Sequence, residues 1–325
     1  MSSVKKTRRL ARAIDRFLTH RRALGYCCRL ETWLLRKLLR HLQEDGRSDL
    51  DDRSFARWLR SLQDRHPNTR HQWYHTVRRF CLSRRRHEPG CFVPSPDGAA
   101  KRQPCVTPVI LEAGQIGHML EIASQLPQTN GSPLRGPALR LAIVLLYACG
   151  LRIGELRRLQ LGDLEERNTV LRIRESKFHK SRLVPLSPSV TRELQTYLRK
   201  RRKAFMATPG TPLLCNRYYE DAHPYSQPGL QGAINQLFDA AGVRDEHGRR
   251  PRVHDLRHSF AVQALIRWYR KGADVQSCLP KLALYMGHVS IESSAYYLHW
   301  IPTVQRLASQ RFEQHFGHLV QGGAR

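Results

Sequence analysis

A stretch rich in proline and glycine divides this 325-residue chain into two unequal parts. It includes Pro89-Gly90, residues 94–98, and further prolines at positions 104 and 108. Because proline removes a backbone donor and glycine weakens both helices and strands, no regular element should pass through such a segment. A chain of this length commonly forms two domains. We therefore predict a first domain over residues 1–92, a linker over 93–108, and a second domain over 109–325 that ends in a helical tail.

The first part has the periodicity of four helices. Apolar residues recur at intervals of three and four, which places their side chains on one face of a helix. A small helical unit with a shared core is the expected result, and Asn68 is the expected N-cap of its last helix. The four apolar stripes are Ile14, Phe17 and Leu18; Leu34, Leu35, Leu38, Leu39 and Leu42; Phe55, Trp58, Leu59 and Leu62; and Trp73, Val77, Phe80 and Cys81.

The second part combines helices with a short β-hairpin. An apolar helix is predicted over residues 139–149, closed by Gly150 and followed by another helical turn. Alternating apolar and charged residues at 169–174 and 182–186 predict two antiparallel strands joined by a basic turn. After Pro188 the pattern is helical almost to the end of the chain, apart from two loops. The predicted fold class is mainly α with a small antiparallel β-sheet, an α+β architecture.

Basic residues greatly outnumber acidic ones, with 55 Lys and Arg against 27 Asp and Glu and a formal net charge of +28. Both parts are basic, because residues 1–107 carry 25 basic and 10 acidic residues. An imbalance of this size lowers the stability of the folded chain by self-repulsion, so a polyanion, namely nucleic acid, is the expected partner. Any single arginine of the first part could instead be solvated charge. The candidates there are Arg8, Arg9, Arg21, Arg22, Arg78, Arg79, Arg84, Arg85 and Arg86.

The sequence does not favour a membrane or secreted protein. Its longest apolar run, residues 141–149, is too short to span a bilayer. The N-terminus is basic but lacks the apolar core of a signal peptide. The eight cysteines contain no CxxC pair and are more consistent with reduced core thiols than with disulfides or zinc ligands. We expect a protein of a bacterial-type cytoplasm, associated with DNA.

Two arginines are candidates for a phosphate clamp. A guanidinium is planar, permanently charged and able to donate two parallel hydrogen bonds to a phosphate, which a lysine cannot do. Arg152 and Arg257 are the candidates. Taken alone, Arg152 is better explained by an interaction with the dipole at a helix C-terminus or by a pair with Glu155 three residues later.

Two histidines and a tyrosine accompany these arginines. His254 lies three residues before Arg257, so both side chains share one helix face and can meet the same phosphate. His288 follows the glycine of an expected turn, where a polar side chain can project into a cleft. Tyr297 supplies a phenol nine residues later. Together these groups indicate a site that attacks a phosphodiester.

The order of these residues resembles the tyrosine recombinase family of the lambda-integrase type. That family carries Arg, Lys, His-x-x-Arg, Gly-His and Tyr in this order, and the counterparts here are residues 150–156, 176–186, 254–261 and 284–288 followed by Tyr297. The likeness covers roughly residues 108–300, and the first part resembles the family's core-binding domain by architecture. The family's lysine corresponds to Lys177, with Lys180 as the alternative because this turn lacks the glycine that the family often has.

The resemblance implies a site-specific DNA recombinase or integrase. Its catalytic residues would be Arg152, Lys177, His254, Arg257, His288 and Tyr297, acting through a 3′-phosphotyrosyl intermediate without metal or other cofactor. Its partners would be double-stranded DNA and further copies of the chain in a tetrameric synapse, with or without other recombinases of the same element. The long segment 267–281 resembles transposon-borne and integrase-type members, which favours a role in a mobile element.

Three other interpretations remain open at the level of sequence. His254-Asp255-Leu256-Arg257-His258 resembles a zinc-protease helix with Asp in place of Glu, although Arg257 would oppose a dication. A type IB topoisomerase would use similar residues to relax DNA without exchanging strands. A catalytically inactive DNA-binding accessory protein would need only the positive charge.

Overall fold

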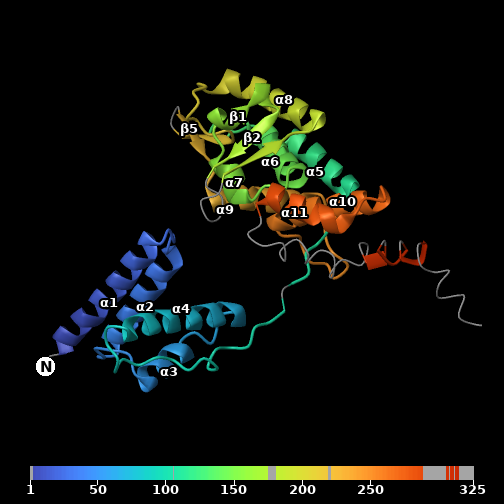
Figure 1. Cartoon of the computed structure of the whole chain (residues 1–325). Coiled ribbons are helices and arrows are strands. Elements are labelled where there is room, and N and C mark those ends of the chain that lie inside the picture. Colours follow the sequence, from blue (N-terminus) through green and yellow to red (C-terminus); the bar gives the residue numbers. More distant parts are fainter. Residues whose placement is uncertain are drawn as a thin grey trace, which may run out of the picture. The chain divides into compact units, whose positions relative to one another are not determined.

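The computed structural model describes residues 3–104, 106–174, 181–218 and 221–287, together with short pieces at 305–306, 308–310 and 312–314. The chain divides into two compact units, Met1–Val106 and Thr107–Arg325 (Figure 1). The division falls inside the segment predicted as a linker. Each unit has its own buried core and is described separately below.

The first unit is a four-helix assembly, as its periodicity predicts. Its helices are α1 (Ser3–Ala23), α2 (Arg29–Glu44), α3 (Asp52–Arg60) and α4 (Pro67–Arg85). The four apolar stripes meet in one core, and all of their residues are buried except Leu39 and Leu59, which are partly buried. The Phe17 and Phe80 rings pack edge to face at 5.7 Å between centroids. Burial of these stripes is the main source of the unit's stability.

The start of α4 differs from the prediction. Its N-cap is His66, whose Nδ1 accepts a hydrogen bond from the backbone of Asn68 at 3.2 Å, and Pro67 occupies the first helical position. Proline suits that position because the first backbone N–H groups of a helix have no intrahelical acceptor. The Asn68 side chain instead makes two hydrogen bonds to the backbone of Gln103, at 2.8 and 3.1 Å.

Residues 93–103 run along α4 as an ordered strap. The Tyr74 hydroxyl donates to the carbonyl of Ser95 at 2.6 Å, and Arg78 Nε donates to the carbonyl of Pro94 at 3.1 Å. Val93 and Ala99 pack against the helical core. The first part of the predicted linker is therefore bound to the first unit by both polar and apolar contacts.

One of the nine arginines expected on the polar faces is buried. The Arg84 side chain is only 4% exposed and donates to both oxygens of Asp49, at 2.5 and 2.6 Å, and to Glu88 at 2.7 and 2.8 Å. Two carboxylates compensate the cost of moving this charge out of water. Arg84 thus holds the end of α4 to the segment before α3. It is neither an exposed phosphate contact nor solvated charge, the two alternatives that the sequence left open.

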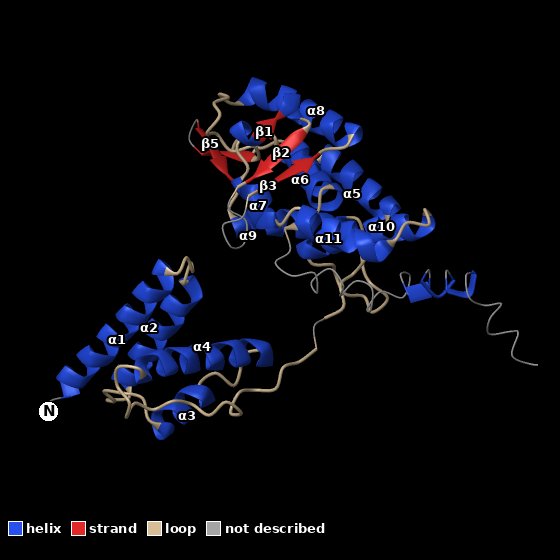
Figure 2. Cartoon of the chain, viewed as in Figure 1, coloured by secondary structure: helices blue, strands red, loops and turns tan. Residues whose placement is uncertain are grey.

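The second unit is mainly helical with two small antiparallel sheets; in Figure 2 all strands of the described residues lie in this unit. Its order is α5 (Ala113–Gln125), α6 (Arg135–Ala148), α7 (Ile153–Arg158), η1 (Leu161–Asp163), β1 (Leu164–Glu165), η2 (Glu166–Asn168), β2 (Val170–Ile173), β3 (Arg182–Pro185), α8 (Pro188–Ala204), β4 (Cys215–Tyr218), β5 (Asp221–Pro224), α9 (Gln227–Ala240), α10 (Val253–Arg270) and α11 (Val275–Met286).

The predicted hairpin forms, and the structure adds a second hairpin. Strands β2 and β3 pair antiparallel with Val170 opposite Pro185 and Ile173 opposite Arg182, and β1 extends the sheet on the other side of β2. Strands β4 and β5 pair within a stretch after Pro188 that the sequence pattern predicts to be helical. That expectation was wrong because these strands have no clear alternation of apolar and polar residues.

Helix α6 is the centre of the second core. It packs against α5, α8 and α10, and eight of its residues from Gly136 to Leu146 are buried. Contact on several sides explains why this stretch is apolar without a single apolar face. No helix in the described ranges has the length and apolar character needed to cross a membrane.

Gly150 ends the α6 region in a conformation that needs glycine. Its φ is +61°, and a Cβ built there would lie 2.5 Å from the Phe260 ring of α10. Left-handed backbone is costly for other residues, and the ring would have to move.

We predict that Gly150→Ala lowers the free energy of unfolding by about 2–4 kcal/mol, because strain and overpacking add. The measurement is chemical denaturation of the full chain. The matched control is Gly232→Ala within α9, where nothing lies within 4 Å of the added Cβ. That variant should gain about 0.5–1 kcal/mol from the better helix former. Equal stability of the two variants would contradict the close packing of Phe260 against Gly150.

Candidate active site

Arg152 occupies the N-cap of α7, just after the left-handed Gly150. Its Nη1 donates to Oε1 of Glu155 at 2.7 Å, and its Nη2 donates to the carbonyl of Gly287 at 2.9 Å. The side chain is 25% exposed, so part of it faces solvent. Of the two alternatives for this residue, the pair with Glu155 is present. The helix that Arg152 begins presents its N-terminus, where the helix dipole does not favour a positive charge.

Arg257 lies in the first turns of α10 and is almost completely buried, with 2% of its side chain exposed. Its Nη2 donates to the carbonyl of Met286 at 2.6 Å, and its Nη1 donates to the carbonyl of Gly150. Arg152 and Arg257 therefore bind consecutive carbonyls at the end of α11. The structure brings the two predicted clamp residues together at one turn.

Glu155 is a central residue of this site that the sequence analysis treated only as a partner of Arg152. Its carboxylate is 1% exposed and accepts hydrogen bonds from the backbone and side chain of Arg152, at 3.0 and 2.7 Å. It also accepts two from Arg182, the first residue of β3, at 3.1 and 2.9 Å. Burial alone would raise the pKa of Glu155, but these arginine contacts outweigh it and hold the pKa at about 2.

The signal for Glu155 was its spacing from Arg152. A glutamate three residues after an N-cap can reach back to the backbone N–H of that cap, as in a capping box, and Glu155 does so. The contacts with Arg182 could not be anticipated, because they depend on the position of a strand that follows in the chain. Arg257 Nη1 lies 4.0 Å from Oε2 of the same carboxylate.

His254 lies in the first turn of α10, three residues before Arg257, and is exposed to solvent. Yet the partial burial of its ring and the charges of Arg257 and Arg152 lower its pKa to about 4. His258 packs edge to face on it at 4.6 Å between ring centroids, and its pKa is also lowered to about 4, first by burial and then by His254. Both rings are therefore neutral at pH 7 and able to accept a proton.

A zinc-protease helix has little support in these contacts. Asp255, which stands in place of the protease glutamate, is buried and receives hydrogen bonds from the backbone and side chain of Arg252. Within the described ranges no group of three His, Cys, Asp or Glu side chains could hold a metal ion.

Four of the residues named in the sequence analysis, Lys177, Lys180, His288 and Tyr297, lie outside the described residues. Their immediate neighbours are described. Strand β2 ends at Ile173 and β3 begins at Arg182, on either side of the lysines. Gly287, directly before His288, ends α11 with a φ of +66°. This confirms the predicted glycine turn before His288.

The sequence profile of the phage integrase family matches residues 111–302, which is more than half of the chain. The chain belongs to the phage integrase family of tyrosine recombinases. It is a site-specific recombinase, an enzyme of DNA recombination, as the residue order indicated.

Some relatives of this recombinase match along nearly its full length. It is 30% identical to the integrase/recombinase y4rE of Sinorhizobium fredii over 308 residues, covering 93% of this chain and 95% of the relative. The Tn1549 transposon integrase has a TM-score of 0.63 at 17% identity, covering 93% and 98% of the two chains. The lambda integrase has a TM-score of 0.59 at 17% identity, covering 90% and 96%. These two structures support the mainly helical fold with small antiparallel sheets.

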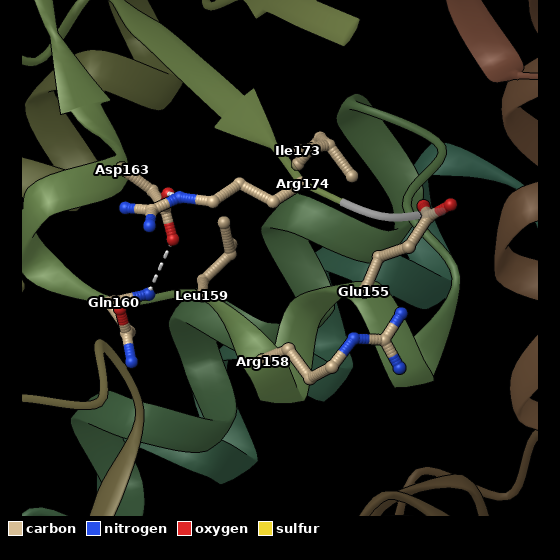
Figure 3. A pocket seen from close by; sticks show the side chains of 7 residues that line it. All are labelled: Glu155, Arg158, Leu159, Gln160, Asp163, Ile173 and Arg174. Carbon is tan, nitrogen blue, oxygen red and sulfur yellow. Dashed lines mark hydrogen bonds and ion pairs between the residues drawn. The ribbon is translucent and has the colours of Figure 1, made fainter. Parts of the chain in front are cut away.

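A hollow of about 250 Å³ lies beside the candidate site, between α7 and the end of β2. Figure 3 shows the side chain of Arg174 extending to Asp163, while Glu155 lies at the opposite side of the hollow. Asp163 is 4% exposed on its side chain and also accepts from the backbone of Gln160 at 2.9 Å. This ion pair joins Arg174, the residue directly after β2, to Asp163 of η1.

We predict that Glu155→Gln lowers the free energy of unfolding at pH 7 by about 3 kcal/mol, because it removes the buried charge that Arg152 and Arg182 contact. The pKa of Glu155 is about 2, below its ordinary value of 4.5. Its contribution is therefore complete above pH 4.5 and is lost as the pH falls toward 2. The variant should lack this part of the acid dependence in denaturation curves between pH 7 and 3.

Glu121→Gln is the control for this measurement, because the Glu121 side chain is 73% exposed and its partner is a histidine on the same helix. It should leave both the stability and its acid dependence nearly unchanged. Glu155→Gln with the acid profile of the unchanged protein would contradict the depressed pKa.

Proposed function

We infer that this recombinase cuts and rejoins duplex DNA through a covalent bond between the DNA 3′ phosphate and Tyr297, in the service of a mobile element. The observation that carries the proposal is the meeting of Arg152 and Arg257 at the Met286–Gly287 turn, directly before His288. Two guanidiniums from distant segments converge there, and a single carboxylate, Glu155, opposes them. The remaining positive charge suits a phosphate diester.

The proposed reaction divides charge and proton transfer among these groups. The Tyr297 oxygen bonds to phosphorus while the bond from phosphorus to the 5′ oxygen breaks. Arg152, with its partly exposed side chain, contacts the nonbridging oxygens, and the buried Arg257 adds charge at short range. His288 would contact the same phosphate. The phosphoester energy is kept in the new bond, so a 5′ hydroxyl of another strand can reverse the step without ATP.

Proton transfer completes the proposal. A phenol with an ordinary pKa near 10 is a poor nucleophile at pH 7. His254 can accept its proton, since the histidine pKa of about 4 keeps the ring neutral at that pH. Lys177 gives a proton to the leaving 5′ oxygen, with Lys180 as the alternative. No metal or other cofactor is needed in this scheme.

The relatives support the proposed partners. The Tn1549 integrase was solved in complex with transposon right end DNA, and the lambda integrase as a dimer bound to a core site. We therefore propose that this recombinase binds double-stranded DNA in the cytoplasm as a homo-oligomer, with four protomers in the recombining synapse. Other recombinases of the same element could join that synapse. The integrase names of the relatives favour this function over a type IB topoisomerase or an inactive accessory protein.

Substitution of two neighbouring tyrosines tests which of them is the nucleophile. On a helix, adjacent side chains diverge by about 100°, so only one of Tyr296 and Tyr297 can face the phosphate. We expect Tyr297→Phe to abolish the covalent protein–DNA adduct, trapped on a nicked suicide substrate, while the affinity for DNA changes little. Tyr296→Phe is the matched control and should retain the adduct. Loss of the adduct only in Tyr296→Phe would overturn the assignment.

The leaving-group proton is tested by sulfur substitution. A thiolate leaves without protonation, so a substrate with sulfur as the bridging 5′ atom should restore cleavage to Lys177→Ala. On the natural oxygen substrate we expect cleavage by Lys177→Ala to be slower by about 10²–10⁴-fold, the usual contribution of a general acid. Rescue of Lys180→Ala with no rescue of Lys177→Ala would move the role to Lys180.

A further inference from the structure

Arg182 is the residue at which the lysine-bearing hairpin meets the arginine site. It is the first residue of β3 and pairs with Ile173, the last residue of β2. The connection that this pair closes, residues 174–181, contains both Lys177 and Lys180. Whatever fixes Arg182 therefore fixes one end of the segment that carries the proposed general acid.

The guanidinium of Arg182 makes three hydrogen bonds to two other segments of the chain. Its Nη1 and Nη2 donate to the two oxygens of Glu155 at 3.1 and 2.9 Å, and its Nε donates to the carbonyl of Tyr285 at 2.8 Å. The side chain is 9% exposed. Two parallel bonds to one carboxylate fix direction as well as distance. Arg182 is thus held far more rigidly than an arginine on the surface of a strand.

The turn before His288 packs on the same guanidinium. A Cβ built at Gly287 would lie 2.9 Å from Nη1 of Arg182. The carbonyl of Gly287 accepts from Arg152, and Glu155 accepts from both Arg152 and Arg182. The Arg182 side chain therefore connects the β2–β3 hairpin, the start of α7 with Glu155, and the end of α11.

We propose that Arg182 is a positioning residue for strand cleavage, which sets the hairpin lysine against the phosphate held by Arg152 and Arg257. The inference rests on the proposed function. Arg182 acts through the base of the hairpin and through Glu155, and it has no need to touch DNA. A purely structural role would lower the stability of the protein without any preference for one leaving group. A positioning role makes the defect depend on whether the leaving atom needs a proton.

The test compares Arg182→Lys and Arg182→Gln on two duplex substrates, one with the natural bridging 5′ oxygen and one with sulfur in its place. We expect single-turnover cleavage of the oxygen substrate to slow by about 30-fold or more, since a displacement of about 1 Å can cost a factor of 10². The affinity for DNA should stay within about threefold. Most of the lost rate should return with the sulfur substrate, as for Lys177→Ala.

Arg172→Gln is the matched control on the neighbouring strand. Arg172 belongs to the same hairpin and is ion-paired with Glu165, but its side chain is 53% exposed and contacts no residue of the site. Its removal should change the cleavage rate of either substrate by less than about twofold, as for most exposed pairs.

Three outcomes would overturn the inference while leaving the proposed function intact. They are an unchanged cleavage rate in both Arg182 variants, an equal loss on the oxygen and sulfur substrates when Lys177→Ala is rescued, and loss of folded structure in both variants by thermal unfolding. If Arg182→Gln alone fails to fold, Arg182→Lys decides, because it keeps the charge. A missing covalent adduct in the unchanged protein would overturn the proposed function, and the inference with it.

Discussion

The buried carboxylate of Glu155 is the interaction on which the rest of the site depends. Three guanidiniums, those of Arg152, Arg182 and Arg257, lie within 4.0 Å of it, and their mutual repulsion would open the site without a negative charge between them. Burying a charged group costs several kcal/mol unless partners surround it, and Glu155 accepts four hydrogen bonds. One negative charge against three positive ones leaves the site attractive to an anion.

This arrangement fixes the two arginines of the proposed phosphate clamp in place. Their side chains are held by the carbonyls of Gly150, Met286 and Gly287, so the proposed reaction would need little reorganisation of them. Backbone conformation and close packing explain the two glycines of the site. Gly150 and Gly287 both have positive φ, and each lies against a side chain of the site region that leaves no room for a Cβ.

The sequence was sufficient for features that depend on local spacing. The helical stripes of the first unit, the apolar α6, the β2–β3 hairpin and the pairing of Arg152 with Glu155 are all visible as intervals along the chain. The features that it could not provide depend on distant contacts. Arg84 looks like any other basic residue at the end of α4 until Asp49 is brought beside it, and nothing near β3 indicates that Arg182 reaches Glu155. The sequence does not predict the β4–β5 hairpin, because its two strands lack an alternation of apolar and polar residues and are held by pairing with each other.

The strap along α4 limits where residues can be inserted between the two units. Residues 93–103 look like a flexible spacer, but Tyr74, Arg78 and Asn68 hold their backbone through hydrogen bonds. Leu111 is held again in the second unit, where its backbone donates to Ser259 at 2.8 Å. An insertion is tolerated where it breaks few buried or hydrogen-bonded contacts. Extra residues should therefore be accepted between Gln103 and Pro108, because Pro108 is buried and Ile110 packs against the core of the second unit. The same residues placed a few positions earlier would break the hydrogen bonds between the strap and α4.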